Sequence, residues 1–513
     1  MRFLLTGFST VGLLIAGLAT KPLPCQAAGE PITIARDDPQ LFVDDYLIES
    51  QIDLKRTLRR PVKDHGGRRP FIMPGHGEAL QAWGSIVYDT RLEKYIMYLL
   101  YRSADGFRMG QATSSDGLHW DQNHAHQLIP VTFDMDLEPE PGFENRTGID
   151  LFTCHYDDSD SEYPYQGWLF YANFGLDREG IYYVRSRDGR QWERGRQICS
   201  AFAGEGDTSC TTVHQDGKTV SGPGDVTLFS YDPLEDRFLG IFKFFRITPG
   251  EPLANGYRSR AYLWLDGLDV PVDTDRIDRI ALLPSGAQQD GETPFDEYYA
   301  STAWRYGSLW LGGLKIHHAQ GDYPYSAAGC SFLKLVVSRN GLDWRRVPYA
   351  NDAGVPEVFI ANGPEGGNHG LNDGGYLCEF SQGPLRVGDE LLYYYSATSY
   401  GKNHPRGIRV TGGGVFRARL RVDGFVSVDW GTLTTRPLRL EGDRLFVNAI
   451  GPVTVEALDE AANVIGTAEV AGDSIRHEVA FDGRTLGELA RTRPVRLRFT
   501  VPPEGTLYSF TVR

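Results

Sequence analysis

Several features that mark common classes of protein are missing from this sequence. Only six of its 513 residues are cysteine, and none stand in a CxxC spacing, which argues against a zinc site. Acidic residues outnumber basic ones by 67 to 52, so no basic face is left to neutralise a nucleic acid or an anionic membrane. There is no GxSxG elbow, P-loop or GxGxxG turn between strand and helix. The charge balance suits a protein that handles a neutral substrate.

The N-terminus is the one strongly apolar stretch. "MRFLLTGFSTVGLLIAGLAT" places one Arg before a short apolar run, and small residues follow near Ala27. This pattern is typical of a secretory signal peptide over residues 1–27, so we expect a secreted or periplasmic protein that is not held in a membrane. In that oxidising setting Cys199 and Cys210, which flank a Gly-rich loop, either form a disulfide or remain buried thiols.

One short phrase recurs along the chain. It reads "SSDGLHW" at residues 114–120, "SRDGRQW" at 186–192 and "SRNGLDW" at 338–344, with weaker copies around Asp266 and Asp423. Asp-Gly and Asn-Gly are strong signals for a hairpin with a type I′ turn, in which both central residues have positive φ. The copies lie about 70–80 residues apart, a spacing that fits one blade of a β-propeller with a long loop.

A second pattern completes each repeat. A turn rich in Tyr and Asp lies between two aromatic strands upstream of each phrase, as in "GSIVYDTRLEKYIMYLLY". Five four-stranded units result, so the expected fold is all-β, with a five-bladed β-propeller over residues 28–431. "QLFVDDYLIES" (residues 40–50) is expected to supply a closing strand or an N-terminal cap. Short alternating strands over residues 432–513 predict a small C-terminal β-sandwich.

Each of the five units carries an acidic residue just before or at the start of its innermost strand. Glycoside hydrolysis uses two carboxyl groups, a general acid with a raised pKa and a base or nucleophile. Glu297 precedes two Tyr residues that lower the local dielectric, so we predict that it is the acid. Asp225 would orient it or tune its pKa, and Asp373 or Asp150 would be the base or nucleophile. The five acidic residues are Glu78, Asp150, Asp225, Glu297 and Asp373.

Sugar sites also need aromatic platforms and polar groups that hydrogen-bond hydroxyls. Loop and strand-start residues of these types are predicted to contact the substrate, together with two of the acidic residues above. The adjacent pair His317–His318 lacks a metal-ligand spacing, so no metal site is predicted there. The predicted substrate-binding residues are Glu78, Trp83, Arg146, Asp150, Tyr298, His369 and His404.

With five units, one acid in each and a C-terminal sandwich, the chain resembles the five-bladed propeller glycoside hydrolases of families 32, 43, 62, 68 and 130. "LFVDDYLIES", "RTLRRPVK" and the ending "VRLRFTVPPEGTLYSFTVR" resemble secreted bacterial proteins described as family-32-like. The resemblance covers nearly the whole chain after the signal peptide. It departs from family 32 in three places. The Trp-Met-Asn-Asp-Pro-Asn-Gly motif is missing. The Arg-Asp-Pro motif has only a partial counterpart in "YDP", and the Glu-Cys motif is replaced by "CEF".

The resemblance implies a secreted glycosidase that acts on a poly- or oligosaccharide and requires no cofactor, and it leaves a structural Ca²⁺ ion open. Fructoside chemistry is not implied, because the family 32 motifs are missing. Two alternatives stay open. One is a carbohydrate-binding propeller without catalysis. The other is a glycoside phosphorylase, which needs one acid and a cluster of basic residues for phosphate, for which Arg146, Arg258 and His404 are candidates.

Overall fold

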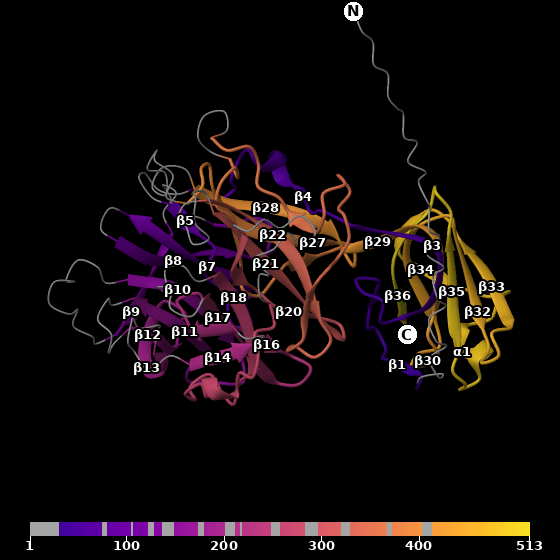
Figure 1. The fold of residues 1–513 in the computed structure, drawn as a ribbon, viewed down its shortest axis with the longest axis horizontal. Coiled ribbons are helices and arrows are strands. Elements are labelled where there is room, and N and C mark those ends of the chain that lie inside the picture. The colour runs from indigo at the N-terminus through magenta and orange to yellow at the C-terminus, as the bar shows by residue number, and fades with distance from the viewer. Residues whose placement is uncertain are drawn as a thin grey trace, which may run out of the picture.

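The protein is all-β and forms two bodies that are joined by a strand (Figure 1). The larger body carries the central part of the chain, and the smaller one carries the C-terminal part. Strand β29 (Val426–Thr435) runs from one to the other. The computed structural model describes residues 30–73, 79–103, 106–121, 128–135, 148–172, 179–200, 211–215, 218–247, 257–282, 296–319, 329–366, 372–402 and 413–513.

The larger body consists of five successive, largely antiparallel meanders. A short pair of strands opens the first, fourth and fifth meanders, and the long strand that follows pairs with both. Strands β9 and β13 pair in parallel and so join the first two meanders into one sheet. The strands are β5 (Ala79–Gln81), β6 (Ile86–Asp89), β7 (Lys94–Ser103), β8 (Gly106–Ser114), β9 (Ile129–Asp134); β10 (Gly148–Tyr156), β11 (Tyr165–Ala172), β12 (Gly180–Ser186), β13 (Gln191–Ser200); β14 (Thr211–Gln215), β15 (Lys218–Gly222), β16 (Leu228–Asp232), β17 (Arg237–Ile247), β18 (Tyr257–Trp264); β19 (Asp296–Ser301), β20 (Trp304–Tyr306), β21 (Leu309–Ala319), β22 (Gly329–Ser338), β23 (Trp344–Arg346), β24 (Val358–Ile360); β25 (Cys378–Glu379), β26 (Leu385–Val387), β27 (Glu390–Thr398) and β28 (Gly413–Arg421).

Hydrogen bonds link the opening segments of the five meanders into a closed ring. Each segment bonds to the next one along the chain, and the fifth bonds back to the first. A central ring of this kind lets one side chain from each meander point toward a common axis. The linking pairs are Phe152 N to Trp83 O, Thr153 Oγ1 to Phe229 O, Ser230 Oγ to Ala303 O, Thr302 Oγ1 to the Glu379 carboxylate, and Ser381 N to Gly84 O.

The repeated Ser-x-Asp/Asn-Gly-x-x-Trp phrase forms outer hairpins, as predicted, but the turn type is different. Ser186 pairs with Trp192, and Ser338 with Trp344, across the two ends of the phrase. Gly189 has a φ of 72°, while its Asp neighbour is not in the positive-φ region, so the turn is not type I′. Side chains hold the loop instead, because the Ser186 hydroxyl accepts the N–H of Gly189 at 2.9 Å and Trp192 donates to the Gly189 carbonyl at 3.1 Å.

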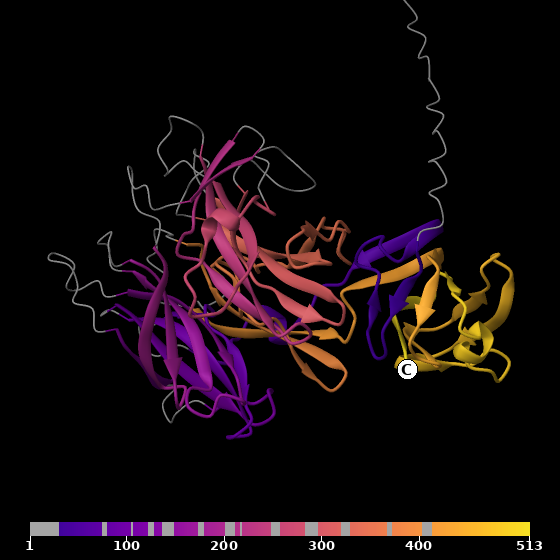
Figure 2. The ribbon, with the colours of Figure 1, turned by 90° about the horizontal axis from the view of Figure 1, so that it is seen from below.

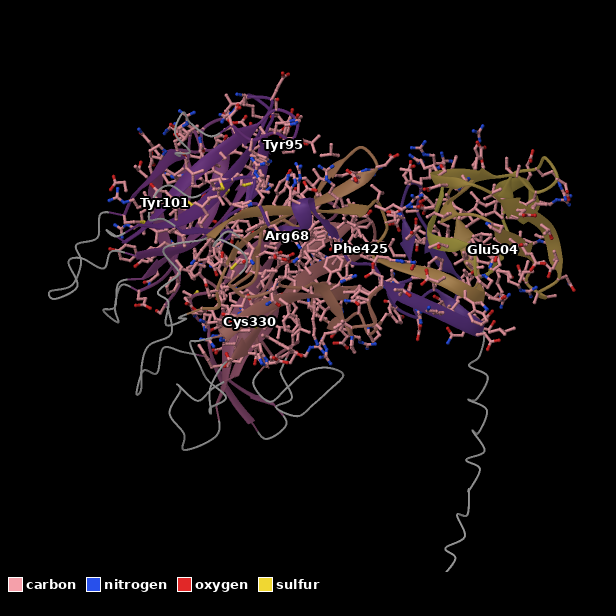
Figure 3. The ribbon with its side chains drawn as sticks, turned by 90° about the horizontal axis from the view of Figure 1, so that it is seen from above. Arg68, Tyr95, Tyr101, Cys330, Phe425 and Glu504 are labelled. Carbon is pink, nitrogen blue, oxygen red and sulfur yellow. The ribbon has the colours of Figure 1, made fainter. Side chains whose placement is uncertain are left out.

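The smaller body is built around a single long sheet with its own hydrophobic core, in which Leu433, Val447 and Phe499 are fully buried. Phe425 lies at the junction of the two bodies, and Glu504 lies within the smaller one (Figure 3). A capping box opens the one α-helix of the described residues. Besides β29, the C-terminal elements are β30 (Leu438–Leu440), β31 (Leu445–Ile450), β32 (Val453–Leu458), β33 (Val464–Val470), β34 (Asp473–Val479), α1 (Leu486–Ala490), β35 (Arg496–Val501) and β36 (Thr506–Val512).

The N-terminal strands do not lie where the sequence analysis placed them. Strands β1 (Ile32–Ile34), β2 (Gln40–Leu41) and β3 (Ile48–Leu58) pair with β30, β36 and β29 of the smaller body, as Figure 2 shows in indigo beside the C-terminal strands. "LFVDDYLIES" therefore does not close the larger body. The closing strand is β4 (Val62–Lys63), which pairs with β28 and is followed by the 3₁₀ turn η1 (Asp64–Gly67).

Candidate active site

Glu297 is a fully buried carboxyl group near the start of β19. Its Oε2 accepts a hydrogen bond from Nη1 of Arg258, with which it forms an ion pair. Within the described part of the chain, no group donates a hydrogen bond to its Oε1. Burial raises the pKa of Glu297, and the neighbouring Arg258 opposes that rise. A buried carboxyl with a raised pKa and one oxygen without a donor can hold a proton and deliver it.

A β-bulge lies two residues after Glu297 and places Tyr299 in the same cluster. The register between β19 and β21 shifts between Tyr298 and Ala300, so Tyr299 is the extra residue of the bulge. The Arg258 guanidinium lies 4.6 Å from the Tyr299 ring centroid. Lys402 lies at the same distance and donates to the Tyr299 hydroxyl at 2.6 Å. Arg258 and Lys402, which come from two other strand regions, therefore both lie against the Tyr299 ring. Cations are attracted to the face of an aromatic ring.

Lys315 is buried among aromatic rings on β21. Its Nζ lies 4.6 Å from the Trp83 ring centroid, 4.9 Å from that of Tyr299 and 3.2 Å from that of Tyr376. It also lies 2.9 Å from the Sγ of Cys378. Trp83 and Tyr299 stack at 6.5 Å with 26° between their planes. The predicted substrate-binding Trp83 thus lies in the same cluster as the predicted acid.

Asp225 is connected to the surroundings of Glu297 by two basic residues, Lys243 and Arg260. It forms an ion pair with Lys243, a cation that also lowers the pKa of Glu297. Gly224 leaves space for Lys243, because a Cβ at that position would overlap with the lysine side chain. Arg260, fully buried, donates to the carbonyls of Val226 at 2.7 Å and of Tyr298 at 3.1 Å. It therefore joins the residue after Asp225 to the residue after Glu297.

These residues form what we call the Glu297 cluster. It brings together residues of β17, β18, β19 and β21 with residues next to β6, β16, β25 and β27, around one buried acid. His317, the cross-strand partner of Glu297 on β21, is fully buried and has its ring 5.5 Å from that of Tyr299. The members are Trp83, Asp225, Lys243, Arg258, Arg260, Glu297, Tyr299, Lys315, His317, Tyr376 and Lys402.

Asp373 lies in a different buried cluster. Its carboxylate forms an ion pair with Lys63 of β4 and accepts the hydroxyl of Tyr395 at 2.9 Å. Its backbone N–H donates to the Gly67 carbonyl at 3.0 Å. Among the described residues, its contacts are not shared with Glu297. Asp373 thus holds β4 and the turn η1 to the fifth meander, while its catalytic role stays a prediction.

Glu379 is a second fully buried glutamate, on β25. Burial raises its pKa to about 7, and its Oε1 accepts the hydroxyl of Thr302. A Cβ on Gly313 would overlap with this carboxylate, so the strand backbone lies directly against it. Within the described residues no lysine or arginine is recorded in contact with it. A raised pKa alone therefore does not distinguish the two glutamates; their surroundings do.

The remaining predicted site residues have mixed outcomes. Tyr298 packs in the hydrophobic core of the larger body, with its carbonyl used by Arg260. Asp150 lies on β10, but its side chain is outside the described part of the structure. The proposed partner of Cys199, Cys210, also lies outside the described residues. So do four predicted contacts, namely Glu78, Arg146, His369 and His404.

Sequence reasoning missed most of the cations of this cluster. Lys243, Lys315 and Lys402 were not singled out, and the pair at 317–318 was considered only as a metal site. A signal was present: "FKFF" and "LKIHH" place a basic residue inside an otherwise apolar buried strand. Such residues are rarely buried without a partner or a function. In the described residues, no group of three or more His, Cys, Asp or Glu side chains is arranged to hold a metal ion.

Comparisons with known proteins give distant similarities. No family model and no curated protein matches the chain. Among solved structures, it is similar to Zg3597, a family 117 glycoside hydrolase of Zobellia galactanivorans, at TM-score 0.36 and 10% identity over 71% of this chain and 89% of that one. It is also similar to a fructofuranosidase of Schwanniomyces occidentalis, at TM-score 0.36 and 11% identity over 90% and 98%.

A third similar structure is a sugar deacetylase. It is an N-acetylgalactosamine deacetylase of F. plautii, at TM-score 0.38 and 12% identity over 71% of this chain and 94% of that one. At such identities a shared fold does not fix the reaction or the substrate. No helix of the described residues is long and apolar enough to cross a membrane.

Proposed function

We propose that this protein is a glycoside hydrolase, with Glu297 as the general acid that protonates the leaving-group oxygen. The observation that carries the proposal is the setting of Glu297 beside Arg258 and the rings of Trp83 and Tyr299, because Glu379 shares its burial, its raised pKa and an oxygen without a donor among the described residues. Glu297 is fully buried with a raised pKa, and one of its oxygens accepts no hydrogen bond from the described residues. A general acid must keep its proton near neutral pH and have a free path for its transfer. The rings of Trp83 and Tyr299 beside it suit the apolar face of a sugar.

The second carboxylate of the proposed mechanism is Asp225. Lys243 supplies a counter charge, and Arg260 fixes the adjacent backbone to the segment that carries Glu297. Glu297 would protonate the leaving oxygen as the glycosidic bond breaks. Asp225 would stabilise the positive charge on the sugar ring and accept the proton of the water molecule whose oxygen takes the place of the leaving group. The sequence analysis gave this place to Asp373 or Asp150. We prefer Asp225 to Asp373 because Lys63 and Tyr395 bind the carboxylate of Asp373 in a separate cluster.

The framework we propose for this site is a five-bladed β-propeller. The five meanders would be the blades, and the ring of hydrogen bonds between their opening segments would be its centre. The smaller body would be a β-sandwich that includes β1 to β3 in addition to the strands after residue 431. Residues 1–27 would be a signal peptide, and the protein would act outside the cytoplasm on a poly- or oligosaccharide.

A glycoside phosphorylase is the second candidate. It replaces water with phosphate as the attacking group and needs cations to hold it. The observation in its favour is that Lys243, Arg258 and Lys402 all act on the charge of Glu297. It needs only one protein carboxyl group, so Asp225 would then serve only to position Lys243.

Reducing-sugar release from a broad panel of polysaccharides and oligosaccharides tests the proposal. The chain without residues 1–27 is assayed beside Glu297→Gln, with and without phosphate. Release by the wild type in phosphate-free buffer, lost in Glu297→Gln, supports the hydrolase. Release that requires phosphate supports the phosphorylase. Binding to a polysaccharide in an affinity gel without any release would overturn both and leave a carbohydrate-binding protein.

A further inference from the structure

The larger body has a pocket on the side of its central hydrogen-bonded ring that faces away from Glu297. Along the opening segment of each meander, members of the Glu297 cluster come before the ring, and pocket residues come at the ring or after it. In the fourth meander Glu297 precedes Thr302 of the ring, and Trp304 of the pocket follows. The pocket has a volume of 310 Å³, and we call it the axial pocket. Its walls include Tyr88, His155, Tyr156, Tyr231, Arg305 and Gln382.

The three tyrosines of the axial pocket come from one repeated dipeptide. Tyr-Asp stands at the end of the opening strand in the first three meanders, at 88–89, 156–157 and 231–232. The Asp makes the turn that follows, since the Asp89 carboxylate accepts the N–H groups of the next two loop residues at 2.8 and 3.0 Å. The turn makes no use of the Tyr, and Tyr88 is 43% exposed. Single exposed aromatic residues are ordinary, but three that line one pocket indicate a binding surface.

His155 adds hydrogen-bonding groups to this aromatic wall. Its ring lies 4.2 Å from that of Tyr231. Within the described residues, its two ring nitrogens make no hydrogen bond. Burial lowers the pKa of His155, so the imidazole is neutral at pH 7 and offers one donor and one acceptor. A sugar hydroxyl can donate and accept, and therefore matches this side chain.

The axial pocket is preformed, and its charge is balanced. The Gln382 amide donates to the Cys154 carbonyl at 2.9 Å and accepts the N–H of Ile86 at 3.2 Å, which joins three opening segments. Among the described residues that line the pocket, Arg305 is the one charged side chain at neutral pH. It donates to the Asp232 carboxylate at 3.0 Å. A preformed pocket with aromatic walls and a balanced charge suits a neutral saccharide better than an anion.

A groove between the two bodies adjoins the axial pocket. Trp304, Arg305 and Gln382 line both hollows. The groove has a volume of 500 Å³ and reaches Thr511 on β36 of the smaller body. Two adjoining hollows give room for several linked sugar units, so the site suits a chain better than a single sugar.

We propose that the axial pocket is a second, non-catalytic site that binds a neutral saccharide chain, with Tyr88 and Tyr231 against sugar rings and His155 bonded to a hydroxyl group. This inference goes beyond the proposed hydrolase and does not depend on it. In a hydrolase, the second site would hold one part of a polysaccharide while another chain or segment reaches Glu297. Polymers would then bind more tightly than short fragments that fill the Glu297 cluster alone.

Native affinity gels that contain laminarin, galactomannan, xylan or inulin test this inference. All variants are made in Glu297→Gln, so that the polysaccharide stays intact. We expect at least one polymer to retard the protein, and Tyr88→Ala and His155→Ala each to weaken its affinity by at least about fivefold. Tyr46→Ala is the matched control and should bind as before. Tyr46 is also 43% exposed, but it lies outside the pocket with its ring against Arg339.

A second measurement separates the axial pocket from the catalytic site. With Glu297 intact, Tyr88→Ala should keep kcat/KM on a short oligosaccharide within about twofold of the wild type, because distant sites act independently. Equal retardation of Tyr88→Ala and Tyr46→Ala, or a loss on the short oligosaccharide as large as that on the polymer, would overturn the second site and leave the hydrolase intact. Lack of retardation by every polymer would also overturn it. Retardation that requires Tyr88, without sugar release by the wild type, would retire the hydrolase and keep the second site.

Discussion

Glu297 and Glu379 are two buried glutamates that open neighbouring meanders, and they differ in what surrounds them. Both are at most 5% exposed, and burial raises the pKa of both. Glu297 has an arginine on one oxygen, two lysines acting on its charge and Tyr299 two residues away. Glu379 has the Thr302 hydroxyl and the backbone of Gly313. In the proposed function the first setting would bind the substrate, whereas the second joins β25 to the fourth meander through the Thr302 hydroxyl.

Asp373 extends the comparison. It is also a buried carboxylate paired with a cation, and from sequence it was as good a catalytic candidate as Glu297. Its Oδ2 accepts hydrogen bonds from both Lys63 and Tyr395, and the backbone of two glycines lies close against the carboxylate. Burial and an ion pair therefore do not distinguish Asp373 from Glu297. Their surroundings differ, because the Tyr299 ring and Lys402 lie beside the Arg258 that pairs with Glu297.

The largest effect is expected when the two glutamates are compared by mutation. Glu297→Gln should lower kcat on the active substrate by about 10²–10⁴-fold, because the general acid is lost while the shape is kept. Glu379→Gln should change kcat less than about threefold, since its carboxyl group only supports the structure. Steady-state kinetics on folded protein, checked by circular dichroism, measures both. A full loss of activity in Glu379→Gln with Glu297→Gln active would move the acid to β25.

Removal of the cation beside Asp373 should act on stability and not on catalysis. Lys63→Met leaves a buried carboxylate without its counter charge, and the free energy of unfolding should fall by about 3–5 kcal/mol. The double variant Lys63→Met/Asp373→Asn should recover part of that loss. Urea denaturation of the single and double variants gives the comparison. If kcat of the folded single variant falls as far as in Glu297→Gln, Asp373 is catalytic after all.

The titration of Glu379 should make the free energy of unfolding depend on pH. Its pKa in the folded protein is raised to about 7, so the folded state holds a proton that the unfolded state has lost between about pH 4.5 and 7. Stability should therefore decrease as the pH rises through that window, by on the order of 3 kcal/mol in total. In Glu379→Gln this decrease should be absent. Urea titrations at pH 4.5, 6 and 8 measure it, and parallel curves for the two proteins would refute it.

The smallest effect is expected at the aromatic surface. Trp83→Ala removes the ring that stacks on Tyr299 and lies over Lys315, and should raise KM about three- to tenfold. Trp304→Ala is the contrasting variant, because Trp304 packs in a separate core cluster and should lower stability with little change in KM. A rise in KM of the same size in both would show that Trp83 acts through packing alone.

The structure brings some of the predicted site residues together, while their chemical roles stay predictions. The scan for an acid at each strand start named Glu297 and Asp225, and the search for aromatic platforms named Trp83; all three lie in the Glu297 cluster, because their positions follow from local strand and turn patterns. The scan could not separate Asp373 from Glu297, since the partner that binds Asp373 is Lys63, 310 residues away along the chain. Pairing of β3 with β29 is equally non-local. Local patterns carry no information on such partners.

The turns of the repeated phrase also show what a local sequence pattern leaves undetermined. The repeated phrase was correctly predicted to form a hairpin between outer strands, but not to have the turn type that it has. The Ser186 and Asp188 side chains hold the loop by accepting backbone N–H groups, which makes a second positive φ unnecessary. A dipeptide signal such as Asp-Gly gives the place of a turn, whereas its conformation depends on the hydrogen bonds of the whole phrase.

The most direct test of the central claim compares leaving groups. Once the panel has identified the sugar, kcat/KM is measured for wild type and Glu297→Gln on the natural glycoside and on its 2,4-dinitrophenyl glycoside, whose leaving group departs without protonation. If Glu297 is the acid, the variant should lose about 10²–10⁴-fold on the natural glycoside and stay within about tenfold of the wild type on the aryl glycoside. Equal losses on both substrates would contradict the assignment of Glu297 as proton donor.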